Sequence, residues 1–105
     1  MPSADISNFE PLVHETAGIL KALSHPERLK ICCALRHEEM SVGDIETFLG
    51  IDQPRLSREL AKLRELELVN TRRESKLIYY TLNCESKVGA LLDAICAVMQ
   101  NEHSS

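Results

Sequence analysis

The stretch that decides the fold is DQPRLSRELAKLRELELVNTRRESK, which runs from Asp52 to Lys76. Its first half predicts a helix, because Leu56, Leu60 and Leu63 recur at the spacing of one core-facing helical stripe. Asp52 is a residue type that often caps a helix N-terminus, and the proline two residues later is tolerated in a first turn. We therefore expect one short helix with a single buried face.

The second half of the stretch predicts a β-hairpin. Residues 68–72 and 77–82 favour strands, and the polar residues 73–76 between them form a turn. A cationic helix followed by a hairpin with a basic tip is typical of a winged helix-turn-helix.

The cations of this stretch predict a DNA-binding face. Arg55, Arg58 and Lys62 follow at i, i+3 and i+7, so they share a helical face that can contact phosphates and base edges. From Gln53 to Lys76 the chain has seven Lys/Arg and four Asp/Glu residues, a net charge of about +3. The remainder has five Lys/Arg and twelve Asp/Glu residues, a net charge of about −7. The net charge of −4 thus includes one locally basic segment, and the local field decides DNA binding. The alternative interpretation is a solvated helix face beside an ordinary hairpin.

Length and composition limit the class of protein. A chain of 105 residues forms a single domain, 1–105, with a modest core, and about residues 1–6 and 101–105 are expected to be flexible. The N-terminal MPSADISNFE does not resemble a signal peptide, and no apolar stretch approaches the length of a membrane span. We therefore expect a cytoplasmic protein that does not bind membranes, with its four cysteines as thiols.

Helices are also predicted on both sides of the central stretch. Residues 7–23 carry an apolar stripe, residues 26–37 follow a serine expected to cap them, and residues 41–50 have a serine cap and a terminal glycine. The last helix, residues 84–101, has an apolar stripe of its own. The chain between the first and last helices is too small to cover both stripes. We therefore expect these helices to pack together in a homodimer, which suits a palindromic DNA site.

Two adjacent cysteines of the second predicted helix differ in their expected surroundings. Cys32 falls inside the apolar face, whereas Cys33 falls at its edge, with Lys30 three residues before it and His37 four after it. A nearby cation lowers the pKa of a thiol and burial raises it. Cys33 is therefore the candidate reactive thiolate and Cys32 a core residue. The alternative is that both simply pack, since free cysteine is often buried.

Three segments together resemble the ArsR/SmtB family of small bacterial winged-helix repressors: LKALSHPERLKICCAL, SVGDIETFLGIDQPRLSRELAKLRELELV and TRRESKLIYYTL. The resemblance covers about residues 19–82 and implies a mainly α-helical winged helix-turn-helix with a small β-hairpin wing, in the order α-α-α-α-β-β-α. It also implies a homodimer that occupies double-stranded operator DNA and leaves it when an inducer binds, without enzymatic activity. The residues that it assigns to the recognition helix and the wing are Gln53, Arg55, Ser57, Arg58, Arg72, Arg73 and Lys76.

One residue departs from the family pattern. Relatives often have His at the position of Glu59, and a carboxylate near the DNA face repels phosphate. Glu59 can instead accept a hydrogen bond from cytosine N4, or pair with Arg55 or Arg58 within the helix.

The sequence leaves two classes of inducer open, which are metal ions and compounds that react with thiols. Many relatives sense metals, but residues 41–44 contain no arsenite-type cysteines, and only His103 remains of the zinc-type set. We therefore expect no metal and no cofactor, with a non-standard metal site of Cys84, Cys96 and His103 as the alternative. Another branch of the family senses persulfides or oxidants with one cysteine on the second helix and one on the last, as Cys33 and Cys96 are placed. A small sulfur compound or oxidant would then oxidise one thiol and the second would resolve it, provided that the two are close enough to bond.

A small thiol protein or a protein-interaction module is the alternative from another class. A redox enzyme commonly has Cys-x-x-Cys, whereas Cys32 and Cys33 are adjacent. An interaction module would not need a cationic wing. Both features favour the DNA-binding repressor.

Overall fold

The computed structural model describes the backbone of residues 6–104 and the side chains of residues 9–100. Within these residues, five helices and three strands follow one another along the chain. Their bounds are α1 Ile6–Leu23, α2 Pro26–Leu35, β1 Met40–Ser41, α3 Val42–Leu49, α4 Gln53–Glu65, β2 Val69–Glu74, β3 Leu77–Leu82 and α5 Val88–Ser104. The predicted winged helix-turn-helix is confirmed, and the two-residue strand β1 is an addition to the predicted order.

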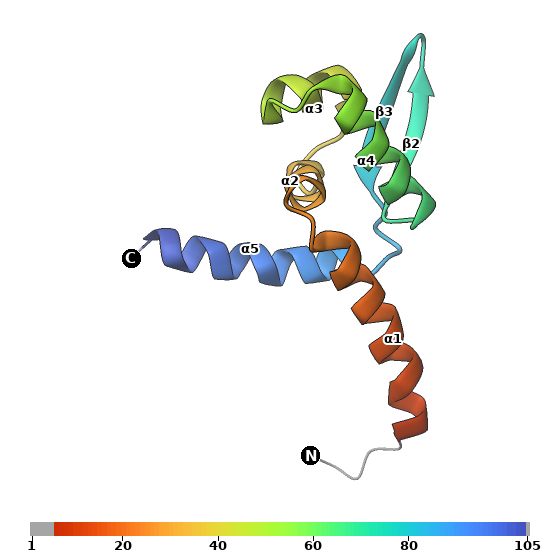
Figure 1. Cartoon of the computed structure of the whole chain (residues 1–105), viewed down its shortest axis with the longest axis vertical. Coiled ribbons are helices and arrows are strands. Elements are labelled where there is room, and N and C mark those ends of the chain that lie inside the picture. The colour runs from red at the N-terminus through yellow and green to blue at the C-terminus, as the bar shows by residue number, and fades with distance from the viewer. Residues whose placement is uncertain (1–5, 105) are drawn as a thin grey trace.

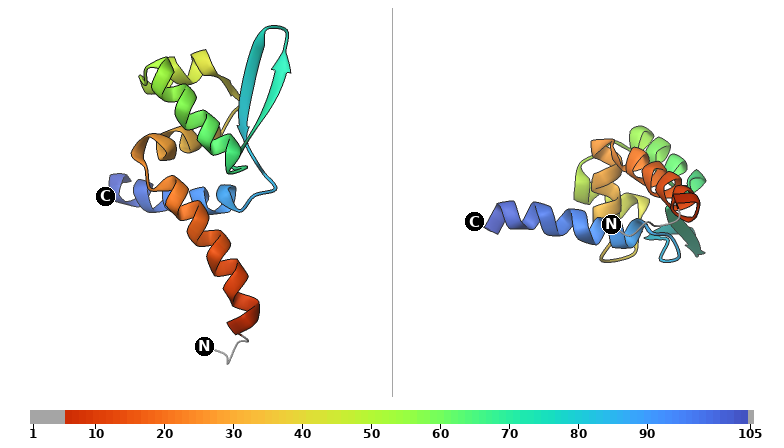
Figure 2. Two further views of the ribbon diagram at one scale, coloured as in Figure 1. Left: turned by 45° about the vertical axis from the view of Figure 1, so that its right-hand side comes forward. Right: turned by 90° about the horizontal axis from the view of Figure 1, so that it is seen from below.

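The elements predicted to read DNA and the long terminal helices lie at opposite ends of the molecule. The helices α3 and α4 and the β2–β3 hairpin form one end, and α1 and α5 extend from the other (Figure 1). Between them lies α2, which contacts α5 on one side and α3 and α4 on the other. The N-terminal half of α1 projects away from the other elements in Figure 1 and in the left view of Figure 2, so this chain leaves much of its surface uncovered.

One hydrophobic core holds α4 in place. The leucine stripe predicted for this helix is buried: Leu56 and Leu63 are inaccessible and Leu60 is 1% exposed. Burial contributes about 1.5–3 kcal/mol for each side chain of this size, which fixes α4 against its neighbours. The other fully buried large side chains of this core are Ile31, Ile45, Val69, Val88, Leu92 and Cys32.

Local hydrogen bonds specify both ends of α3. Ser41 Oγ accepts a hydrogen bond from the Asp44 amide at 3.2 Å, and the Asp44 carboxylate accepts one from the Ser41 amide at 3.2 Å. This is a reciprocal capping box, as the predicted serine cap requires. Gly50 ends the helix with φ of 68°, where a side chain would be strained, so its predicted role is also confirmed. The turn into α4 is therefore set by the sequence.

Several predicted boundaries differ from the structure. Ser24 does not cap α2, because its hydroxyl donates to the Lys21 carbonyl at 2.7 Å and His25 takes the N-cap position. The helix α5 begins four residues later than predicted, since Asn83 Oδ1 accepts a hydrogen bond from the Glu85 amide at 3.0 Å and holds a turn there. The helical backbone of α5 continues to Ser104, beyond the predicted end at residue 101. Of the terminal residues predicted to be flexible, 1–5 and 105 lie outside the described residues.

The wing has a shorter turn than predicted. Arg73 is opposite Ile78 and Glu74 is opposite Leu77, so both belong to β2, and residues 75–76 alone form the turn. The error arises because an exposed strand of charged residues has no apolar pattern to mark it. Strand β1 pairs with the other edge of β3 and gives a three-stranded antiparallel sheet in the order β1-β3-β2.

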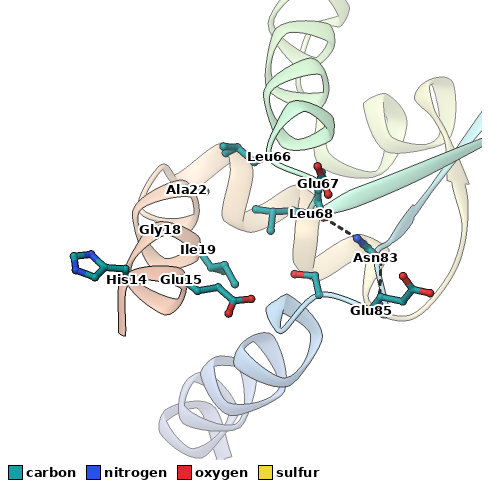
Figure 3. A pocket seen from close by; sticks show the side chains of 11 residues that line it. His14, Glu15, Gly18, Ile19, Ala22, Leu66, Glu67, Leu68, Asn83 and Glu85 are labelled. Carbon is teal, nitrogen blue, oxygen red and sulfur yellow. Dashed lines mark hydrogen bonds between the residues drawn. The ribbon is translucent and has the colours of Figure 1, made fainter. Parts of the chain in front are cut away.

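A polar cavity of about 460 Å³ lies at the base of the wing, between α1 and the turns that precede β2 and α5 (Figure 3). Asn83 joins the two turns, because its Nδ2 donates to the Glu67 carbonyl at 2.9 Å while its Oδ1 holds the Glu85 amide. Neither cysteine of the predicted pair lines this cavity. We therefore interpret the cavity as part of the structural connection between α1 and the wing, and not as a ligand site.

Candidate nucleic-acid interface and cysteine pair

The solvent face of α4 carries the residues predicted to contact DNA. Arg58 forms no hydrogen bond or ion pair within the described residues, so its guanidinium is available to a phosphate. Lys62 lies 3.0 Å from Glu65, but such an exposed pair contributes little energy and is easily exchanged. The predicted residues of this helix are all exposed: Gln53, Arg55, Ser57, Arg58 and Lys62.

Arg55 is held by two carboxylates. Its guanidinium donates to the carboxylate of Glu27, in the first turn of α2, and lies 3.8 Å from that of Asp52. The hydrogen bond and charge of Glu27, followed by the charge of Asp52, raise the pKa of Arg55. Because the pair is exposed, a DNA phosphate can compete for this arginine.

In the described part of the chain, the wing, like α4, has one arginine that is paired with carboxylates and other cations that are not. Arg72 donates to both carboxylate oxygens of Glu39 at 2.6 and 2.8 Å and to Glu74 at 2.5 Å, and its guanidinium lies 4.8 Å from the ring centroid of Tyr79. The hydrogen bond with Glu39 is the main cause that raises the pKa of Arg72, and it also lowers the pKa of Glu39. In contrast, Arg73 and Lys76 are exposed and form no such contact within the described residues.

Glu59 pairs with a residue of α2 and not with the arginines of its own helix. Its carboxylate accepts a hydrogen bond from Arg28 Nε at 2.7 Å, and the two side chains are 20% and 15% exposed. Of the alternatives considered for Glu59, pairing with Arg55 or Arg58 is therefore not the arrangement in the structure. Arg28, 31 residues away in the sequence, compensates the charge of Glu59. The residue that departs from the family pattern therefore ties α4 to α2.

Cys33 and Cys96 lie in contact. Their sulfur atoms are 3.7 Å apart, although 63 residues separate the two cysteines in the sequence, because α2 packs against α5 here. All four cysteines of the chain are free thiols. A disulfide has a sulfur–sulfur distance of about 2.05 Å, so the two sulfurs would have to approach by about 1.7 Å when an oxidant joins them.

Cys33 does not have the lowered pKa that we predicted. Partial burial, followed by the hydrogen bond and charge of Cys96, raises the pKa of Cys33 to about 11, and Arg36 only partly opposes this. Lys30 and His37, which we expected to lower it, are exposed, so water screens their charges. Cys32 is fully buried, as predicted, and burial raises its pKa to about 12.

The helix α2 connects the cysteine pair to α4. Just beyond its C-terminal end, Arg36 Nη1 donates to the Leu92 carbonyl of α5 at 3.4 Å, and Arg36 Nε lies 3.6 Å from the Asp93 carboxylate. At its N-terminal end, the ion pairs of Glu27 and Arg28 reach α4. These contacts join α2 both to α5 and to the predicted recognition helix.

Apolar faces of α1 and α5 are left uncovered in the single chain. The two helices diverge (Figure 1), so neither covers the other along its length. The large apolar side chains that remain exposed on them are Phe9, Leu12, Val13, Leu20, Val98 and Met99.

The alternative metal site has no further support in the described part of the chain. Among residues 9–100, no three His, Cys, Asp or Glu side chains are grouped so that they could hold a metal ion. Cys84 is exposed, Cys96 lies beside Cys33, and the side chain of His103 lies outside the described residues. Likewise, none of the helices described here is long and apolar enough to cross a membrane.

Comparison with known proteins gives the family. The model of the bacterial regulatory protein, arsR family, matches residues 25–71, from the start of α2 into β2. The biofilm growth-associated repressor of Agrobacterium fabrum is 48% identical over 90 residues, which cover 86% of this chain and 76% of the relative. The chain belongs to the arsR family. Its members are transcriptional regulators and not enzymes, so the predicted resemblance is confirmed.

Solved structures agree with this assignment. The crystal structure of the transcriptional repressor BigR from Xylella fastidiosa is 41% identical with a TM-score of 0.83, and covers 93% of this chain and 96% of its own. Reduced HlyU from Vibrio cholerae is 35% identical with a TM-score of 0.78, over 87% and 95% of the two chains. A homodimeric winged helix-turn-helix DNA-binding domain from Mycobacterium bovis is 31% identical with a TM-score of 0.73, over 98% and 93%.

Proposed function

We propose that this protein is a homodimeric DNA-binding repressor that leaves its operator when Cys33 and Cys96 become joined by a disulfide or a short sulfur chain. The observation that carries the proposal is the 3.7 Å contact between two thiols from distant parts of the sequence. The similarity to repressors such as that of Agrobacterium fabrum supports the DNA-binding role. A protein with this role works in the cytoplasm, where bacterial DNA is found.

The DNA-binding surface of the proposal combines α4 with the wing. Arg58, Arg73 and Lys76 are available without any rearrangement, whereas Arg55 and Arg72 first exchange a carboxylate for a phosphate. Phosphate contacts position the helix, and side chains on its solvent face then read base edges. The proposed contact residues are Gln53, Arg55, Ser57, Arg58, Lys62, Arg72, Arg73 and Lys76.

A second copy of the chain is proposed to cover the apolar faces of α1 and α5. These helices extend away from the core, and their exposed apolar side chains form a surface too large to be favourable in water. The homodimeric state of the similar Mycobacterium bovis domain supports this arrangement. A two-fold dimer presents two α4 helices to half-sites one helical turn of DNA apart, or a multiple of that.

The proposed switch is a two-step thiol exchange. The Cys33 thiolate attacks the outer sulfur of a persulfide, R–S–SH, which gives Cys33–S–SH and releases R–SH. Cys96 then attacks the inner sulfur of Cys33–S–SH, forms the disulfide and releases H₂S. The two cysteine sulfurs are oxidised and the sulfane sulfur is reduced. A peroxide reaches the same disulfide through a sulfenic acid, with water as the leaving group in both steps.

The bond is proposed to act on DNA through α2. It fixes α2 against α5, and the part-buried ion pair Arg28–Glu59 carries the resulting displacement to α4. In a dimer, the same displacement changes the spacing of the two recognition helices. Contacts in both half-sites weaken together, which converts a local bond into a loss of affinity.

The test is binding to operator DNA, measured by fluorescence anisotropy before and after treatment with inorganic tetrasulfide. Treated protein is expected to bind more weakly, whereas treated Cys33→Ser and Cys96→Ser remain bound. Cys32→Ser and Cys84→Ser are the matched controls, and both should still respond. A response that survives in Cys33→Ser rejects this cysteine pair.

A further inference from the structure

An apolar groove opens beside Cys33. It has a volume of about 660 Å³ and lies between α2 and α3, with Met99 of α5 at one side. A space of this size is within the usual range of small-molecule sites. Cys33 is part of its lining, so a molecule in the groove is in reach of the thiol. The other apolar side chains that line it include Leu29, Met40, Phe48 and Leu49.

We propose that this groove binds the uncharged apolar substituent of an organic persulfide or polysulfide, whose sulfane sulfur then reacts with Cys33. The inference rests on the proposed function and names the chemical class of the inducer. The exchange is the one written above, and the released R–SH carries the apolar substituent out of the groove.

The low reactivity of the thiol favours an inducer that binds before it reacts. The thiolate is the attacking species, and partial burial and the neighbouring Cys96 raise the pKa of Cys33 to about 11, so little of the thiol is ionised at pH 7. A freely diffusing oxidant rarely meets the ionised form. A molecule held against the sulfur stays through many ionisation events, so binding raises the effective concentration of the reacting sulfur.

The polar edge of the groove indicates which end of the ligand reacts. Lys30, one turn before Cys33, supplies a cation that can stabilise the negative charge of the R–S⁻ leaving group, and His37 is a second nitrogen base at the same edge. Glu38 lies there too and disfavours a further negative charge on the substituent. Alkyl and aryl persulfides therefore suit the site better than a persulfide carrying several carboxylates.

Phe48 offers a direct way to alter the groove. Its side chain is 68% exposed, so replacing it does not remove a core residue. In Phe48→Asp, a charge replaces part of the apolar lining. Leu66→Asp is the matched control, because Leu66 is an exposed apolar residue that does not line the groove.

The experiment measures the rate of Cys33 modification by mass spectrometry in the full-length protein. The probes are inorganic tetrasulfide, ethyl, butyl and hexyl persulfides, and glutathione persulfide. We expect the rate to rise about threefold for each added methylene until the groove is full, which is the gain expected from burying most of a CH₂ group. Glutathione persulfide should react more slowly than butyl persulfide. Phe48→Asp should remove at least tenfold of the rate advantage of hexyl over ethyl persulfide, whereas Leu66→Asp should behave as the parent.

The outcomes separate the two proposals. If tetrasulfide joins the cysteines and releases DNA, but the rate does not depend on chain length or on Phe48, the groove inference is overturned and the proposed function stands. If the chain-length dependence is found but modified protein still binds DNA fully, the groove is a ligand site and the proposed switch is wrong. If Phe48→Asp instead makes the protein monomeric in light scattering, a second copy covers the groove and the inference is also overturned.

Discussion

Joining Cys33 to Cys96 should raise the free energy of unfolding by about 4 kcal/mol, because the bond closes a long loop. The two residues are 63 apart in the sequence, and a crosslink of that span removes about 14 cal/mol/K of entropy from the unfolded chain in the loop-closure treatment. Their sulfurs are already 3.7 Å apart, so only a small native-state distortion subtracts from this gain. For a domain of this length, the Tm should rise by about 15–30 °C.

The assay is calorimetry of reduced and tetrasulfide-treated protein at pH 7 and one fixed protein concentration, since a dimer melts in a concentration-dependent way. Mass spectrometry first confirms the loss of two hydrogens in a Cys33–Cys96 disulfide. Treated Cys96→Ser should melt as untreated Cys96→Ser does, and treated Cys84→Ser should show the full increase. A protein that carries the Cys33–Cys96 bond and melts at the reduced temperature would refute the reasoning.

Further predictions concern the DNA face, the α2–α4 contact and the buried thiols. Arg58→Ala and Arg73→Ala should each reduce the slope of log affinity against log salt by about one, whereas Lys21→Ala on α1 should leave it unchanged; equal slopes in all three would place the interface elsewhere. Glu27→Gln and Glu39→Gln should strengthen operator binding in anisotropy titrations, because they release Arg55 and Arg72; weaker binding would mean that these carboxylates position the arginines for DNA. Arg28→Ala leaves the Glu59 carboxylate partly buried and unpaired, so urea denaturation should show a loss of about 1–3 kcal/mol, and adding Glu59→Gln should recover part of it. Burial raises the pKa of Cys32 to about 12, so as pH rises the Cys32 thiol ionises in the unfolded chain before it ionises in the folded one. Its contribution to the free energy of unfolding is therefore complete below pH 9 and is lost as pH rises toward 12. Urea denaturation of Cys32→Ala should show a smaller loss of stability over this pH range.

The elements of the fold were predictable because each has a local pattern. The spacing of Leu56, Leu60 and Leu63 determines which face of α4 is buried, and Gly50 marks the end of α3 through a backbone conformation that other residues disfavour. Strand β1 and the length of the wing turn were not predictable, since two residues of strand and a charged exposed strand carry no periodic signal.

The candidate site was predictable in its residue types but not in its contacts. A helical wheel places Cys33 at the edge of an apolar face, yet it does not say which helix covers that edge. The structure places another thiol there and partly buries Cys33, and these raise the pKa of Cys33 more than Arg36 lowers it. The carboxylates of Glu27, Glu39 and Glu59 were missed as partners for the same reason, because ion pairs that span about 30 residues have no sequence spacing of their own.

In the proposed complex with DNA, Glu27 and Glu39, which pair with Arg55 and Arg72 in the free protein, act as internal substitutes for DNA phosphates. A stretch of arbitrary DNA must displace them to gain these arginines, while the net charge of −4 repels the duplex at longer range. The free-energy cost of displacing the carboxylates is offset only at a site where many protein–DNA contacts form together. Because a genome offers an enormous excess of competing sites, weak binding to most of them leaves more of the regulator unbound and free to find its operator. In the proposed complex, the same acidic residues that make this sequence look unlike a DNA-binding protein thus reduce its binding to the rest of the genome.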